Sequence, residues 1–207
     1  MTTRRKMLTE EMKQAIRHSA ARLFAEKGYP SVTMREIAKE AGCSHTAIYL
    51  YFKNKEDLLQ QIAMPPLAEM EGRMLERLGD AEAAPLDKLI GACQEYAVFC
   101  LSNGSFFNVL ITSGSGRVDE PEPELEVNQI RNRIFGHLIQ ALDNVVDDEG
   151  SAADAEAALN RARILFYYMQ GFVHTYNGSL ESIDSLLERT LPIYNQGIRT
   201  LVAGMKA

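Results

Sequence analysis

Residues 33–59 read TMREIAKEAGCSHTAIYLYFKNKEDLL and contain three helix starts within 27 positions. Thr33 and Glu36 have the spacing of a capping box, in which each side chain satisfies a free backbone N–H of the other residue. Ser44 and Asn54 are residue types that favour the N-cap position. Gly42 lies where the first helix has to end, and glycine tolerates the left-handed backbone found there. The stretch therefore predicts a short helix, a tight turn, a second short helix and the start of a third.

A longer helix is expected before this stretch. From about residue 9 to residue 27 apolar side chains recur every three or four positions, and Gly28 follows as a helix-ending residue. Arg4, Arg5 and Lys6 precede it and are expected to form a mobile basic arm. Three helices with a glycine turn between the last two are typical of the helix-turn-helix, whose second helix enters the DNA major groove. The alternative is that the polar residues from Ser44 onward are only a solvated face.

Charge is distributed unevenly along the chain. The net charge is −6, yet residues 1–60 carry +4 and residues 61–207 carry −10. A basic face is the electrostatic footprint of a nucleic-acid-binding module, so the first part suits a DNA partner and the second does not. We therefore expect a DNA-binding domain over residues 1–62, followed by a second domain over residues 63–207.

The composition is that of a globular protein, with 46% apolar residues in 207. No run of eighteen apolar residues appears, and the first residues carry charges, so we expect neither a membrane span nor a secretory leader. Three cysteines, an odd number without zinc-site spacing, fit a reducing compartment. We expect a cytoplasmic protein without metal, cofactor or membrane partner.

Residues 9–60 resemble the DNA-binding domain of the TetR family of bacterial transcriptional regulators. The resemblance rests on these motifs: Thr33, Ile37-Ala38, Ala41-Gly42-Cys43-Ser44, Tyr49-Leu50-Tyr51-Phe52 and Lys55-Glu56-Asp57-Leu58. Cys43, Thr46 and Leu50 depart from the residues common in the family. The first is a small apolar group either way, whereas the other two bear on which DNA sequence is preferred.

The resemblance implies DNA contacts by residues at the start of the first short helix and along the second. Phosphate contacts are implied for Thr33, Tyr49, Tyr51 and Lys55, and base contacts for Arg35, His45, Thr46 and Ala47, with Ser44 capping the reading helix. The physical chemistry agrees, because a free helix N-terminus attracts phosphate and an arginine can pair with guanine. Two alternatives stay open: Tyr49 or Tyr51 packs against the domain, or Arg35 pairs with Glu36 or Glu40.

Residues 63–207 read as further helices, which makes the chain all-α with about nine helices. Pro65 and Pro66 are expected to end or kink the helix that starts after Asn54. Beyond it, helices are expected over residues 85–102, 105–112, 125–146, 152–177 and 182–203, with a loop over 113–124 and a possible kink at Pro192.

The last two helices carry apolar stripes suited to helix-on-helix packing. The resemblance implies that they form the four-helix bundle of a homodimer, and the expected interface residues are Tyr168, Phe172, Leu187, Leu191, Tyr194 and Ile198. The alternative is that both helices close the core of a single chain.

The resemblance also places an effector cavity in the second domain, and the sequence offers aromatic, amide, Met and His residues to line it. The candidates are Tyr96, Phe99, Phe107, Asn108, His137, Phe166, Met169, Gln170 and His174. Aromatic and Met residues at helical spacing are core more often than ligand contacts, so this alternative applies to each of them.

The function expected from these observations is transcriptional regulation. The protein is expected to be a repressor that binds a palindromic operator on double-stranded DNA as a homodimer and is released by a small, largely apolar effector. The alternative is a helix-turn-helix regulator controlled by a protein partner or by no ligand. An enzyme is not expected, because the sequence has no phosphate-binding glycine loop, nucleophile elbow or paired metal ligands.

Overall fold

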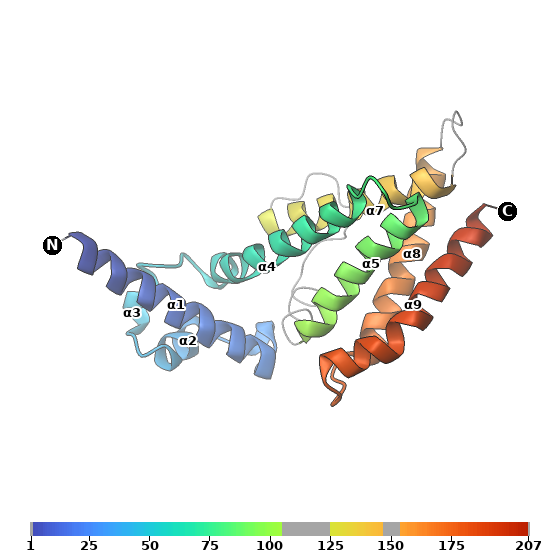
Figure 1. The fold of residues 1–207 in the computed structure, drawn as a ribbon. Coiled ribbons are helices and arrows are strands. Elements are labelled where there is room, and N and C mark those ends of the chain that lie inside the picture. Colours follow the sequence, from blue (N-terminus) through green and yellow to red (C-terminus); the bar gives the residue numbers. More distant parts are fainter. Residues whose placement is uncertain (1, 105–124, 147–153, 207) are drawn as a thin grey trace.

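The computed structural model describes residues 2–104, 125–146 and 154–206, and these residues form an all-helical chain (Figure 1). The predicted fold class is confirmed. The elements are α1 Thr2–Lys27, a 3-10 turn η1 Tyr29–Ser31, α2 Met34–Glu40, α3 His45–Ile48, α4 Lys55–Leu78, α5 Pro85–Ser102, α7 Glu126–Val146, α8 Ala155–Tyr176 and α9 Ile183–Met205. The helix expected over 105–112 and the loop over 113–124 lie outside the described residues.

The described residues bury two separate apolar cores. The first joins α1, α2 and α3 to the start of α4, with Phe24, Ile37, Ile48 and Phe52 at its centre. The second joins the rest of α4 to α5, α7, α8 and α9. Figure 1 shows α4 running from the small group of helices to the larger one. This single helix therefore connects the two cores mechanically.

Helix α4 does not end at its prolines, which corrects that half of the expectation that they end or kink the helix. It continues through Pro65 and Pro66 to Leu78, although neither proline can donate a backbone hydrogen bond to the preceding turn. Leu67, Met70 and Met74 follow the prolines and are buried in the second core. Burial of this apolar stripe holds the later half of α4 in helical register, so tertiary packing overrides the local preference.

Two other helix limits differ from expectation. Helix α1 begins at Thr2, so positions 4–6 belong to the helix and not to a separate arm. Helix α3 has only four residues, and the chain then turns until Tyr51. The predicted span 85–102 is reproduced by α5, which begins at Pro85 as a first-turn proline should.

No helix in the described part of the chain is both long and apolar enough to span a membrane. No group of three metal-binding side chains occurs within residues 2–104, 125–146 and 154–206. Cys93 and Cys100 are free and buried, and burial raises the pKa of the Cys93 thiol to about 12. Neither thiol is therefore a reactive thiolate near neutral pH.

Candidate nucleic-acid interface

The start of α2 is fixed by the capping box that the sequence predicts. The Glu36 backbone N–H donates to Thr33 Oγ1 at 3.2 Å, and the Thr33 N–H donates to Glu36 Oε2 at 2.9 Å. The hydrogen bond from the Thr33 N–H is the largest of the effects that lower the pKa of Glu36 to about 2. The Lys27 ammonium, 3.2 Å from Glu36, adds to them. The box therefore sets where α2 begins and which residues it exposes.

The turn from α2 to α3 depends on Gly42. Its φ of +72° lies in the left-handed region, where a side chain is strained even though open space surrounds this glycine. The Cys43 N–H closes the turn on the Ala38 carbonyl at 2.9 Å, and Ser44 Oγ then accepts from the Ala47 N–H at 3.1 Å. Ile48 is buried, so α3 is anchored from behind and its other side faces solvent.

The exposed side of α2 and α3 carries most of the residues to which the resemblance assigns DNA contacts. Thr33, Arg35, Ser44, His45 and Thr46 are exposed. Two others, Ala47 and Tyr51, are half-buried, and Tyr49 is 47% exposed. The helix-turn-helix thus exposes hydroxyl, imidazole, guanidinium and phenol groups to solvent.

The alternative pairing of Arg35 is not observed. Glu36 is bonded to Thr33 and Lys27, and Glu40 pairs with Arg22 instead. Within the described residues Arg35 makes no ion pair, so its guanidinium is directed to solvent. An exposed arginine at the rim of a reading helix is able to pair with a base edge or a phosphate.

The two tyrosines of this region differ. Tyr51 is half-buried against the first core, as the packing alternative anticipated for one of them. Tyr49 instead stands in solvent, with its ring edge-on to His45 at 5.3 Å between centroids. The His45–Tyr49 pair therefore forms a small aromatic surface on α3.

Lys55 requires a revision of its expected role. Its ammonium donates to the carbonyls of Tyr29 at 2.8 Å and Val32 at 2.9 Å, and it lies 4.3 Å from the centre of the Tyr29 ring. Partial burial lowers the pKa of this ammonium. Lys55 thus fastens the start of α4 to the η1 turn instead of pointing at a phosphate. Lys53 is exposed, and its ammonium has no described partner.

The residues expected to line an effector cavity fall into separate places. Tyr96, Phe99 and Met169 are buried in the second core. Gln170 donates to the Tyr96 hydroxyl at 3.0 Å, and the Phe166 ring lies edge-on to Tyr96 at 5.9 Å. Tyr96 on α5 thus contacts two half-buried expected residues of α8, Phe166 and Gln170, while Met169 belongs to the same apolar core.

The remaining candidates do not join that group. His174 is exposed on α8. His137 is on α7, with its Nε2 3.3 Å from Glu71 Oε1, and it borders a different pocket. Phe107 and Asn108 lie outside the described residues.

The residues expected at the dimer interface differ in their burial. Tyr194 and Ile198 are fully buried inside the chain, and the Tyr194 hydroxyl donates to the Cys93 carbonyl at 3.0 Å, so neither presents a surface to a partner. This corrects the expectation for both. Four others are half-buried: Tyr168, Phe172, Leu187 and Leu191. The exposed apolar side chains of the last two helices are Ile164, Tyr167 and Ile193.

Sequence reasoning missed the pocket beside His137, whose lining includes Leu78, Lys88, Gln140 and Asn144. One signal was available. Lys88 is one of only two lysines after residue 62, in the half of the chain that carries a charge of −10.

Comparison with known proteins adds to this geometry. The family described as "Bacterial regulatory proteins, tetR family" matches residues 16–62. These residues include the later part of α1, all of α2 and α3, and the start of α4. A fatty acid metabolism regulator protein of Bacillus subtilis is 28% identical over 142 residues, or 69% of this chain and 70% of that protein. Several other curated relatives align over only 24–35% of this chain, and the chain spans under two thirds of their length.

Solved structures extend the similarity to the whole fold. The TetR family regulator PfmR of Thermus thermophilus has a TM-score of 0.66 at 20% identity, covering 87% of this chain and 97% of that one. The regulator FadR of Bacillus subtilis, solved in complex with stearoyl-CoA, has a TM-score of 0.61 at 23% identity, covering 92% and 98%. At these identities the likeness concerns the fold alone.

Proposed function

We propose that the chain is a DNA-binding regulator of the TetR family, which residues 16–62 match and which is not a family of enzymes. It acts as a repressor released from its operator by a small, largely apolar effector. The observation that carries this proposal is the exposed side of α2 and α3. Arg35, His45, Thr46 and Tyr49 stand there on a turn built by Thr33 and Gly42.

The proposed DNA contacts divide into two kinds. Arg35, His45 and Thr46 read base edges, with the half-buried Ala47 methyl beside them, since guanidinium, imidazole and methyl groups match distinct base edges. Thr33, Tyr49 and Tyr51 contact phosphates, and Lys53 replaces Lys55 as the nearby cation because its ammonium is directed to solvent. Ser44 caps α3 and sets its direction.

The proposed molecular unit is a homodimer with a DNA-binding domain over residues 1–62 and a second domain over 63–207. Its support is the boundary between the two cores, which falls after Ile62 on α4. The proposed contact surface is the exposed side of α8 and α9 with Ile164, Tyr167 and Ile193, flanked by the half-buried residues first expected there. Two-fold symmetry then requires half-sites separated by about 10 bp or a multiple.

The proposed effector is an acyl compound. The support is that a 28% identical relative is a fatty acid metabolism regulator and that a similar fold was solved with stearoyl-CoA. The second core of this chain offers aromatic and Met side chains to an acyl chain, with the Tyr96–Gln170 pair as a polar point among them. Phe99 and Met169 belong to the same buried group.

The test begins with selection of binding sites from random DNA by the full-length protein, which is expected to return a palindrome. Stearoyl-CoA is then titrated into free protein and into the operator complex, with coenzyme A alone as the control. Release requires that the effector bind the complex more weakly than the free protein, by the same factor by which it weakens DNA binding.

Equal affinities of stearoyl-CoA for the free protein and for the complex would exclude release by this compound. A selection that returned no palindrome would argue against the dimeric repressor. Control by a protein partner would then be the favoured alternative.

A further inference from the structure

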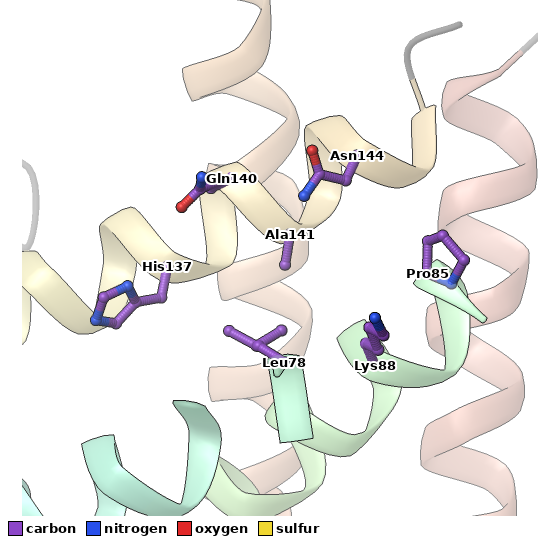
Figure 2. Close-up of a pocket in the computed structure, with 7 residues that line it drawn as sticks. All are labelled: Leu78, Pro85, Lys88, His137, Gln140, Ala141 and Asn144. Carbon is purple, nitrogen blue, oxygen red and sulfur yellow. The ribbon is translucent and has the colours of Figure 1, made fainter. Parts of the chain in front are cut away.

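A pocket of about 370 Å³ lies between the end of α4, the start of α5 and one side of α7 (Figure 2). Figure 2 shows Pro85 and Lys88 on α5 across from Ala141 and Asn144 on α7, with the Gln140 side chain turned away from Lys88. Leu78, from the end of α4, and His137 complete the lining. None of these residues belongs to the aromatic group around Tyr96, so the pocket is a separate place in the second domain.

The pocket offers hydrogen-bond donors that the described part of the protein does not use. Lys88 is half-buried, and its ammonium has no hydrogen bond or ion pair with any described residue. Gln140 and Asn144 are one helical turn apart on α7, and their amide groups are equally unengaged among the residues described. The pocket lining therefore includes a half-buried cation and two exposed amide side chains.

Three carboxylates next to the lining residues are paired with arginines and not with Lys88, and Asp80 and Glu82, between Leu78 and Pro85, make no described ion pair with it. The pairs are Asp87 with Arg199 at 2.8 Å, Glu71 with Arg133 at 3.0 Å and Asp143 with Arg161 at 3.1 Å. Three apolar side chains, Leu78, Pro85 and Ala141, form the rest of the wall. The pocket thus combines a half-buried ammonium, which makes no ion pair with a described residue, with an apolar surface.

We propose that this pocket binds a small molecule with one acid group, a carboxylate or a phosphate, on a short apolar body. The acid group lies on Lys88, where a charge-assisted hydrogen bond is strong, and accepts from the amide of Asn144. The apolar body covers Leu78, Pro85 and Ala141. Concave sites with an apolar lining and a few placed polar groups are typical of small-molecule sites.

The position of the pocket gives its occupant a route to the DNA-binding domain. Helix α4 starts at Lys55, on the η1 turn, and ends at Leu78, in the pocket wall. His137, also in the wall, contacts Glu71 of the same helix. An occupant that fits one placement of α4 against α5 and α7 better than another shifts the population of that placement. This regulatory half rests on the proposed function; the binding site does not.

The test uses three probes with the same eight-carbon body: octanoate, octyl phosphate and 1-octanol. Calorimetric titration of the full-length protein is expected to detect one or both acids, and whichever binds identifies the acid group. Octanol is expected not to bind. Lys88→Met is expected to weaken acid binding at least tenfold, whereas Lys206→Met, a lysine at the end of α9, leaves it unchanged.

Asn144→Leu provides a second variant and is expected to weaken acid binding independently of the lysine. Three results would each overturn the proposed acid-binding site. They are equal binding of octanol and the acids, no binding of either acid, and unchanged acid affinity in Lys88→Met. Operator affinity measured with the acid present separates the two proposals. Lysine-dependent binding without any change in operator affinity leaves the pocket standing and removes its regulatory role. Acyl-CoA release of DNA that is unchanged in Lys88→Met leaves the proposed function standing and places its effector elsewhere.

Discussion

At the residue scale, replacing glycine by alanine is expected to change stability in opposite directions at two positions. Gly42 has φ +72°, whereas Gly72 lies in the interior of α4 with open space around it. Gly42→Ala is expected to destabilise the protein by about 1–2 kcal/mol, because a left-handed backbone strains any side chain. Gly72→Ala is expected to stabilise it by roughly 0.5–1 kcal/mol, because alanine loses less entropy in a helix. Denaturant unfolding measures the free energy of unfolding of both variants. A change in the same direction for both would contradict the prediction that backbone conformation decides the effect.

Two lysines near the start of α4 are expected to have different roles, Lys55 in stability and Lys53 in DNA binding. Lys55→Gln removes hydrogen bonds to the Tyr29 and Val32 carbonyls, so it lowers the melting temperature. Lys53→Gln is expected to leave the melting temperature unchanged. It instead reduces the slope of log affinity for operator against log salt by about 0.9, the value of one phosphate contact. The reverse assignment of the two effects would restore Lys55 as the phosphate contact.

At the scale of the element, the capping box at the N-terminus of α2 is expected to make stability depend on pH. The Thr33 N–H lowers the pKa of Glu36 from 4.5 to about 2, so the folded state favours the carboxylate. A depressed folded-state pKa contributes stability above about pH 4.5, and that contribution is lost as the pH falls toward 2. Glu36→Gln is therefore expected to lower the melting temperature at pH 7, with the difference from wild type closing across this window. Glu11→Gln, an exposed change on α1, is the control substitution.

Helix α4 holds a second element-scale prediction. Pro65 and Pro66 interrupt its hydrogen bonding at the boundary between the two cores. Replacing both by alanine is expected to stabilise the chain, by at most about 3 kcal/mol for each proline. Thermal unfolding measures the gain. The same variant is expected to respond less to effector, since a stiffer α4 bends less at this boundary. A loss of stability would mean that packing of the proline rings outweighs the missing hydrogen bonds.

At the scale of the whole molecule, the exposed apolar side chains of the last two helices predict an assembly. Tyr167 and Ile193 are each 68% exposed on α8 and α9. A charge at either position is expected to split the dimer, because an unpaired charge buried in an interface is costly. Light scattering at micromolar concentration is expected to give a dimer for wild type and for Leu75→Glu on α4, and a monomer for Tyr167→Glu and Ile193→Glu. A monomeric wild type would end the two-fold operator model.

The sequence by itself determined the features that depend on neighbours within four residues. Thr33, Ser44 and Asn54 each cap a helix where their residue type predicts it, and Gly42 turns the chain between α2 and α3. These signals are local because a cap bonds to a backbone N–H only two or three residues away. The helical class and the helix-turn-helix followed from them.

Only the tertiary structure decided the rest. Lys55 meets carbonyls more than twenty residues away, and Tyr194 meets the Cys93 carbonyl 101 residues away. No pattern along the chain indicates such partners, so both residues were expected to face outward. Helix α4 continues through its prolines because the stripe after them is buried by α5 and α7. The pocket beside Lys88 exists because three helices end or pass there together. Burial and long-range hydrogen bonds depend on where distant segments meet, which sequence spacing does not specify.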